Sequence, residues 1–363
     1  MIPIAKPFIG KEEKEAVLSV LGSGMLAQGK VVREFEQKFA EFIGVKHAIA
    51  TSSGTTALHA ALLAHNIKEG DEVITTPFTF IATANAIRMA GANPIFVDIE
   101  EETFNINSDL IESAITEKTK AIMPVHLFGL PAEMEKIQRV AKKYNLSVIE
   151  DSCQAHGATI DDRKVGSFET GCFSFYPTKN MTSGEGGMIT TNDDKIAEKA
   201  RMVINHGSKE KYFHNLHGYN YRMTNLSAAI GLEQLKKLPP FNNRRKEIAL
   251  YYNKELQNLK GIKIPIDKEG HVYHQYTLVV ENRDEFQLKM KDNGVETIVH
   301  YPIPVHKQEA YANFANQIFQ NAEKLASKVV SIPVSPNLTD NQCQQVVNSI
   351  KKSIVYGGNL KDE

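Results

Sequence analysis

The chain has 363 residues, of which 42% are hydrophobic and 23% charged, as in an ordinary globular protein that buries a sizeable core. Its 42 Lys and Arg residues almost balance 43 Asp and Glu residues. The resulting net charge of -1 gives no general attraction for nucleic acid or an anionic membrane, so any anionic ligand must be bound by a local site.

The three cysteines show no paired spacing, which favours a reducing compartment and argues against a structural zinc site. The N-terminus lacks the features of a signal peptide, and no stretch approaches the roughly 18 apolar residues of a membrane span. We therefore expect a cytoplasmic protein. We expect no metal at His214-x-x-His217 or His271-x-x-His274, because neither has a third ligand of recognised pattern, and we interpret these as loop or surface histidines.

The predicted elements alternate between helices and short strands. Two amphipathic helices come first, from Glu12 to Leu21 and then with Val32, Phe35, Phe39 and Phe42 on one face. Alternation of this kind predicts a largely parallel sheet with helices on both faces and ligands beyond the carboxyl ends of its strands. The β-rich runs are His47 to Thr51, Glu72 to Thr75, Pro94 to Val97, Ala121 to Val125, Ser147 to Asp151, Cys172 to Tyr176 and Gly187 to Thr190.

The sequence Leu238-Pro239-Pro240 predicts the end of a helix. Beyond it the chain resumes with a basic helix and mixed strands such as Tyr276 to Val280. We therefore predict a large domain over residues 1–240 and a smaller C-terminal α/β domain over residues 241–363.

Three short segments that follow predicted strands carry candidate chemistry. Ser52-Ser53-Gly54-Thr55 opens an apolar helix, where it forms either a cup for a phosphate or a plain N-cap. Asp151 ends a strand, where its carboxylate either caps the next element or stabilises a protonated pyridine nitrogen. Lys179 lies in a tight turn among apolar or small neighbours, which depress the pKa of an amine and favour Schiff-base chemistry, although most lysines are solvated.

These segments, taken with their order along the chain, resemble the DegT/DnrJ/EryC1/StrS sugar aminotransferase family. The resemblance covers nearly the whole chain and extends to Gly218-Tyr219-Asn220-Tyr221-Arg222 and His300-Tyr301-Pro302-x-Pro304-x-His306. It implies fold type I of the pyridoxal-phosphate (PLP) enzymes, with a mostly parallel seven-stranded sheet. It also implies a homodimer with active sites at the subunit interface.

The resemblance also implies roles for individual residues. Lys179 would bind PLP as a Schiff base and move protons, and Asp151 would pair with the pyridinium nitrogen. Tyr301 and His306 are weaker candidates for the substrate site, and His156 is left outside the catalytic set. The remaining cofactor-binding residues would be Gln154 at the 3-oxygen, Phe80 on the ring, Gly54, Thr55 and Ser174 at the phosphate, and Asn220 from the neighbouring subunit.

The expected reaction passes an amino group from L-glutamate, through the pyridoxamine 5'-phosphate form of the cofactor, to a nucleotide-linked ketosugar. A lysine at position 179 argues against the family members that carry histidine there and deoxygenate sugars. Two alternatives stay open: an aminotransferase of a non-nucleotide keto substrate, and a non-catalytic regulatory relative. A conventional amino-acid enzyme usually clamps the α-carboxylate with arginine, and residues 241–363 contain only Arg244, Arg245 and Arg283.

Overall fold

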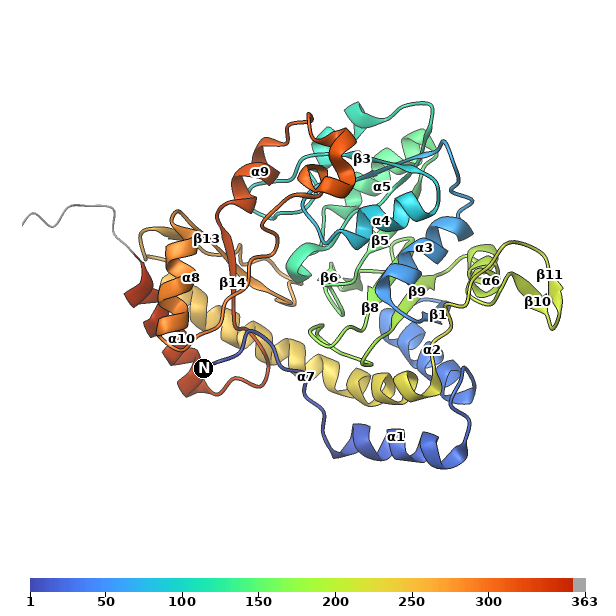
Figure 1. Ribbon diagram of the computed structural model, residues 1–363, viewed down its shortest axis with the longest axis horizontal. Helices are drawn as coiled ribbons and strands as arrows, with labels where there is room; N and C mark the ends of the chain where they lie inside the picture. Colours follow the sequence, from blue (N-terminus) through green and yellow to red (C-terminus); the bar gives the residue numbers. More distant parts are fainter. Residues whose placement is uncertain (355–363) are drawn as a thin grey trace, which may run out of the picture.

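The computed structural model describes residues 1–354, and a seven-stranded sheet lies at its centre (Figure 1). The strand order is β1-β9-β8-β5-β4-β2-β3, and β9 runs antiparallel to both of its neighbours while the remaining pairs are parallel. The predicted mostly parallel seven-stranded sheet is thus confirmed. Its strands are β1 (His47–Thr51), β2 (Glu72–Thr75), β3 (Asn93–Phe96), β4 (Thr119–Ile122), β5 (Ser147–Asp151), β8 (Thr170–Ser174) and β9 (Gly187–Thr191).

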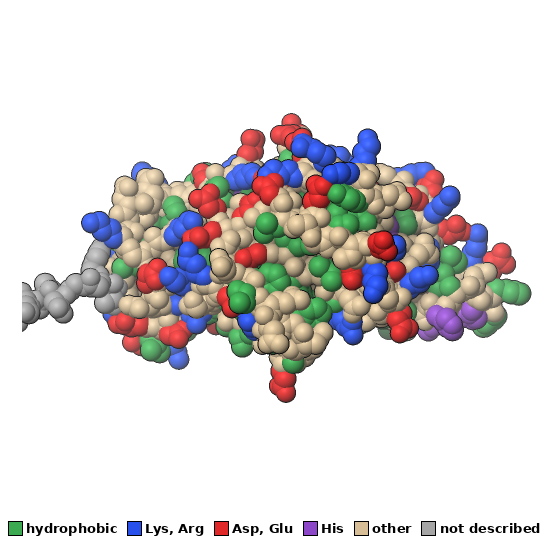
Figure 2. All heavy atoms as spheres, turned by 90° about the horizontal axis from the view of Figure 1, so that it is seen from above, with side chains coloured by type: hydrophobic (Ala, Val, Ile, Leu, Met, Phe, Trp, Pro, Cys, Tyr) green, Lys and Arg blue, Asp and Glu red, His purple; other side chains and the backbone are tan. Residues whose placement is uncertain are grey.

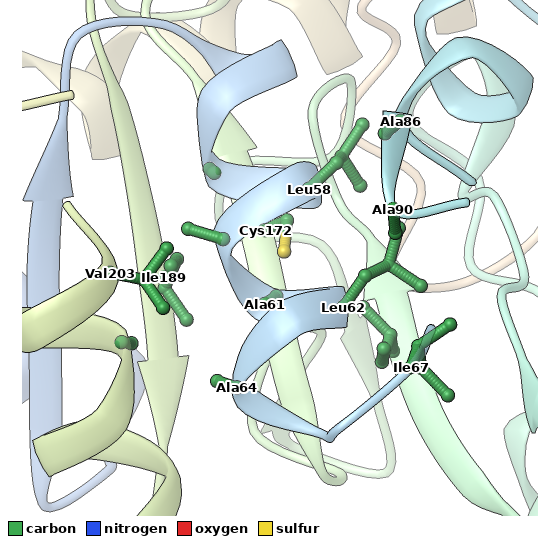
Figure 3. Packing of buried hydrophobic residues seen from close by; sticks show 14 of the residues in the cluster. Leu58, Ala61, Leu62, Ala64, Ile67, Ala86, Ala90, Cys172, Ile189 and Val203 are labelled. Atoms are coloured by element: carbon green, nitrogen blue, oxygen red, sulfur yellow. The ribbon is translucent and has the colours of Figure 1, made fainter. Parts of the chain in front are cut away.

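Helices cover both faces of this sheet because successive strand residues point to opposite sides. Ile49, Cys172 and Ile189 face one hydrophobic cluster, whereas their chain neighbours Ala48, Phe173 and Met188 face another. Small side chains on α3 let this helix lie close to the sheet and to α4 (Figure 3). The first face is covered by α3 (Gly54–Ala64), α4 (Ala82–Met89) and α6 (Asp194–Val203), and the second by α2 (Lys30–Ile43), α5 (Met134–Tyr144) and the first half of α7 (Asn225–Leu256).

The C-terminal part of the chain builds a second core around a three-stranded antiparallel sheet. Ile2 also packs in this core, since the N-terminal segment pairs with Val295. The helix α1 packs against α7 (Figure 1). The elements of this part and the remaining short ones are α1 (Lys11–Ser23), β6 (Thr159–Ile160), β7 (Arg163–Lys164), β10 (Ser208–Glu210), β11 (Phe213–His214), β12 (Ile262–Lys263), β13 (Tyr276–Val280), α8 (Arg283–Asp292), α9 (Gln320–Ala326), β14 (Val329–Ile332), α10 (Asp340–Ser353) and the 3-10 turns η1 (Ser108–Leu110), η2 (Glu112–Ala114), η3 (Leu127–Gly129), η4 (Val305–Lys307) and η5 (Glu309–Phe314).

The helix predicted to stop at Leu238-Pro239-Pro240 continues to Leu256, so that prediction is wrong. A proline removes one backbone donor and crowds the preceding turn, which normally breaks a helix. Here both flanks are buried: Leu238 packs in the core of the large sheet, and Tyr252 packs in the C-terminal core. Tertiary packing of both halves offsets the lost hydrogen bonds. The domain boundary at residue 240 stays a prediction, and the change of core along α7 supports it.

None of the helices in residues 1–354 combines the length and the hydrophobicity that crossing a membrane requires. Acidic and basic side chains are interspersed on the face in Figure 2, as the near-zero net charge suggests. No strongly charged field covers that face.

Candidate active site

A cavity of about 500 Å³ lies beyond the carboxyl ends of the parallel strands. Its wall on the sheet side comes from the segments that follow β1, β2, β5 and β8. Its opposite wall comes from His274, Gln275, His300 and Tyr301 in the C-terminal part of the chain. The three segments singled out in the sequence therefore meet in one place, as the rule for ligand sites in open α/β sheets predicts.

Lys179 lies in the turn between β8 and β9 and lines this cavity. Its backbone N–H donates to the carbonyl oxygen of Tyr176 at 2.9 Å, which fixes the turn. Burial lowers the pKa of the amine, and the nearby Cys153 and Asp151 only partly oppose this. A lowered pKa increases the fraction of the amine that is unprotonated and therefore nucleophilic.

Asp151 ends β5 with its carboxylate buried in the same cavity. Its Oδ2 accepts a hydrogen bond from the hydroxyl of Thr83 at 2.8 Å, and its Oδ1 accepts one from the backbone N–H of Cys153 at 3.2 Å. These two donors fix the direction of the carboxylate. The site therefore holds an oriented carboxylate in the same cavity as an amine whose pKa is lowered by burial.

The segment before α3 serves both as an N-cap and as a wall of the cavity. The side chain of Ser53 accepts a hydrogen bond from the N–H of Thr56 at 3.2 Å, so the N-cap interpretation holds for Ser53. Gly54 and Thr55 begin the helix and line the cavity, where N–H groups and the helix dipole favour an anion. A Cβ on Gly54 would lie 2.6 Å from Cβ of Ser174, so only glycine permits this close approach.

Gln154 connects the two walls of the cavity. Its Oε1 accepts from the N–H of Phe128 at 2.9 Å, and its Nε2 donates to the hydroxyl of Tyr301 at 3.1 Å. Phe80 is 54% exposed and lines the cavity with its ring centroid 6.2 Å from that of Tyr301. An exposed aromatic ring beside fixed polar groups suits a flat aromatic ligand.

The model of the DegT/DnrJ/EryC1/StrS aminotransferase family matches residues 7–351. The chain belongs to this family. The match confirms the resemblance expected from the sequence, the fold type and the aminotransferase chemistry, and it confirms PLP as the cofactor.

Relatives in this family span nearly the same length. A dTDP-3-amino-3,6-dideoxy-alpha-D-galactopyranose transaminase of Aneurinibacillus thermoaerophilus is 42% identical, over 94% of this chain and 95% of the relative. A protein named pleiotropic regulatory protein from Geobacillus stearothermophilus is 44% identical, over 91% of each. The crystal structure of DesV from S. venezuelae, in complex with a ketimine intermediate, superposes with a TM-score of 0.93 at 36% identity, over 96% of this chain and 98% of that one.

The cavity of this family member fits PLP on its own geometry. It contains an amine of lowered pKa, a fixed carboxylate and a helix start that an added Cβ at residue 54 would obstruct. Eight of the ten predicted site residues line it, while His306 and Asn220 do not: Gly54, Thr55, Phe80, Asp151, Gln154, Ser174, Lys179 and Tyr301.

 

Ser53, which precedes Gly54 in the predicted phosphate-binding segment, also lines the cavity. His306 was predicted to line the substrate site, but within this chain it lies outside the cavity. Its imidazole is fully buried, and its Nε2 lies 3.0 Å from Oε1 of Glu323. A histidine held in this way by a carboxylate supports the packing of η4 against α9. Its contact with the substrate stays a prediction.

Asn220 is exposed and also lies outside the cavity of its own chain. It follows the β10–β11 hairpin and forms an isolated bridge with Asn205. Its predicted place is the active site of a neighbouring subunit, which stays a prediction.

Sequence reasoning missed several residues of the site. His274 was interpreted as a loop or surface histidine, but it is only 5% exposed and lines the cavity. Burial is the main cause that lowers the pKa of His274 well below its usual range, and it lowers the pKa of His300 to about 4. Cys153 and Thr83, neither of which the sequence singled out, also line the cavity. The buried strand that begins at Tyr276 is the one sequence feature that placed His274 near a core.

No group of three or more His, Cys, Asp or Glu side chains suited to a metal ion occurs within residues 1–354.

Proposed function

We propose that this chain transfers an amino group from L-glutamate to a nucleotide-linked ketosugar, with PLP as its cofactor. The observation that carries the proposal is the shared cavity in which the amine of Lys179, its pKa lowered by burial, lies with the carboxylate of Asp151. The nucleotide-linked substrate is supported by the 42%-identical relative, which is named a transaminase of a dTDP-linked amino sugar.

When bound, PLP supplies an electron sink for the carbon that carries the transferred amino group. We assign Asp151 to the ring nitrogen, where its fixed negative charge favours the protonated form. Lys179 would anchor the cofactor and, once released, accept and return the substrate proton. The other contacts would come from Phe80 on the ring, Gln154 at the 3-oxygen, and Gly54, Thr55 and Ser174 at the phosphate.

The cations of the chain favour a sugar over an amino acid as the acceptor. Among the described residues, Lys179 is the sole Lys or Arg that lines the cavity. Arg245 is buried nearby, but its guanidinium donates to the backbone carbonyl oxygens of Tyr273, His274 and Val334. No arginine of this wall is therefore arranged to bind an α-carboxylate, as a dedicated amino-acid aminotransferase requires.

Glutamate and the cofactor phosphate are anions that these walls do not neutralise. We infer that a second copy of the chain completes each site in a homodimer and contributes Asn220, which is exposed next to the β10–β11 hairpin. The location in the cytoplasm likewise stays a prediction from the sequence.

The regulatory alternative draws support from the 44%-identical relative named a pleiotropic regulatory protein. A regulator needs neither a cavity amine of lowered pKa nor a doubly hydrogen-bonded carboxylate beside it, and this chain has both. The intact catalytic set therefore favours the enzyme.

The two halves of the reaction can be tested separately by absorbance. Glutamate added to the PLP-loaded protein should convert the cofactor to its pyridoxamine form. A panel of nucleotide-linked ketosugars should then restore the original spectrum with at least one member. Conversion by glutamate, with restoration only by free keto acids other than the 2-oxoglutarate that reverses the first half, would favour the non-nucleotide alternative. Protein that binds no PLP would favour the regulator.

A further inference from the structure

Hydrogen bonds to backbone carbonyl oxygens fix the side-chain orientations of Asn180 and Asn242, which lie next to the turn of Lys179. The Nδ2 of Asn242 donates to the carbonyl oxygen of His156 at 2.8 Å, so its Oδ1 faces the other way, toward Asn180. The Nδ2 of Asn180 donates to that Oδ1 at 2.8 Å and to the carbonyl oxygen of Val272 at 3.1 Å. Because carbonyl oxygens can only accept, neither amide can be reversed without losing its partners.

This chain of hydrogen bonds determines the tautomer of His274. The Oδ1 of Asn180 is left as an acceptor and lies 3.2 Å from Nδ1 of His274. Nδ1 must therefore carry the proton. Burial, and after it the charge of Lys179, holds the pKa of His274 well below its usual range, so the ring is neutral and its Nε2 has a free lone pair.

The surroundings of His274 keep this acceptor in place. The ring is 5% exposed, and the side chain lines the cavity on the wall opposite the sheet. Arg245 donates to its backbone carbonyl oxygen at 3.3 Å. The amide nitrogen of Gln275 lies 3.5 Å from Nε2, at the outer limit of a hydrogen bond, so a better donor can replace it.

We propose that Nε2 of His274 accepts a hydrogen bond from a hydroxyl group of the sugar and thereby contributes to the choice of substrate. The inference rests on the proposed function, since a hexose supplies such hydroxyl donors. Preorganised acceptors discriminate well, because a substrate without the matching donor leaves a buried polar atom unpaired.

The test compares wild-type holoenzyme, in the pyridoxamine form, with His274→Asn by isothermal titration calorimetry. The probes are dTDP-glucose, UDP-N-acetylglucosamine and GDP-mannose, each beside its bare nucleoside diphosphate. The shorter asparagine keeps an N–H donor near Nδ1 for Asn180 and has no group at the position of Nε2. We expect the preferred nucleotide hexose to bind about 10-fold more weakly, with binding of the bare diphosphate unchanged.

His271→Asn is the matched control, because His271 is buried, stacks on Tyr273 at 3.9 Å between ring centroids and lies outside the cavity. It should bind the hexose as the wild type does. Equal hexose binding by His274→Asn and wild type would overturn the inference alone. A wild type that prefers none of the hexoses over its bare diphosphate would instead overturn the proposed substrate class.

If His274→Asn does not fold, 15N spectra of histidine-labelled wild type decide. We expect the resonance of an unprotonated Nε2 to move on addition of the hexose and to stay in place with the bare diphosphate. A spectrum in which no such resonance moves would overturn the inference.

Discussion

The hydroxyl of Thr83, in the first turn of α4, donates a hydrogen bond of 2.8 Å to Oδ2 of Asp151 at the end of β5. Thr83 is itself held by Thr79, whose hydroxyl lies 3.0 Å from its own. The orientation of the Asp151 carboxylate therefore depends on α4, which carries Thr83, as well as on its own strand β5.

Replacement of Thr83 by valine should weaken PLP binding by about 10- to 100-fold, since a hydrogen bond to a charged group contributes about 1.5–3 kcal/mol. Fluorescence titration of the apoenzyme with PLP measures the effect. Thr83→Ser keeps the hydroxyl and should bind PLP like the wild type. Equal affinity of Thr83→Val and wild type would show that this hydrogen bond does not support Asp151.

Removal of the amine in Lys179→Ala should lower the transamination rate by about 10³-fold or more, because a positioned acid–base group contributes about 10²–10⁴-fold. The visible absorbance of lysine-bound PLP should disappear as well. Lys195→Ala removes an exposed lysine of α6 and should change neither property. Normal turnover by Lys179→Ala would remove Lys179 from the mechanism.

Introduction of a methyl group in Gly54→Ala should destabilise the fold by about 1–3 kcal/mol, because the new Cβ would lie 2.6 Å from Cβ of Ser174. PLP affinity should fall too, since the helix start must shift. Gly22→Ala is the control, because no atom in the described part of the chain lies within 4 Å of a Cβ there. Urea unfolding and PLP titration of both variants measure the effect. Only Gly54→Ala should lose stability and PLP affinity.

Acid should destabilise the protein in part through His156. Burial lowers the pKa of His156 to about 3, and within residues 1–354 neither ring nitrogen has a hydrogen-bond partner. The unfolded chain then binds the proton first, so the stabilisation is present above the unfolded pKa of about 6.5 and is lost as the pH falls toward 3.

His156→Phe should remove this dependence, and the ring of His156 already packs between those of Phe173 and Phe175. Between pH 7 and pH 5 the free energy of unfolding should fall by about 2 kcal/mol less in the variant than in the wild type. Urea unfolding at both pH values measures the difference. Parallel slopes in the two proteins would exclude His156 as a source of acid sensitivity.

The role of Asn220 can be tested in hybrid dimers. We expect Asn220→Ala to weaken PLP retention in the neighbouring subunit, since its own cavity does not include residue 220. In one hybrid, one subunit carries Asn220→Ala and the other carries Lys179→Ala, so both changes fall in one site and the second site stays intact. In the other hybrid, one subunit carries both changes, so each site has one defect. Identical activity of the two hybrids would refute a contribution across the interface.

Local sequence was sufficient for the elements and for the main chemical groups of the site. Short β-rich runs between amphipathic helices placed the seven sheet strands within a few residues, because strands buried on both faces are short and apolar. Asp151 and Lys179 could be found because they follow such strands, at the edge where ligands of open α/β sheets bind.

Only the tertiary structure decided what depends on contacts between distant segments. Pro239 and Pro240 looked like a helix end, but packing in two cores carries α7 through them. His274 was predicted to be a loop or surface histidine but is buried next to Asn180, since the burial of a histidine depends on its neighbours in space. The chain thus encodes its chemistry locally, while the surroundings of each side chain, which set its pKa and its partners, arise only on folding.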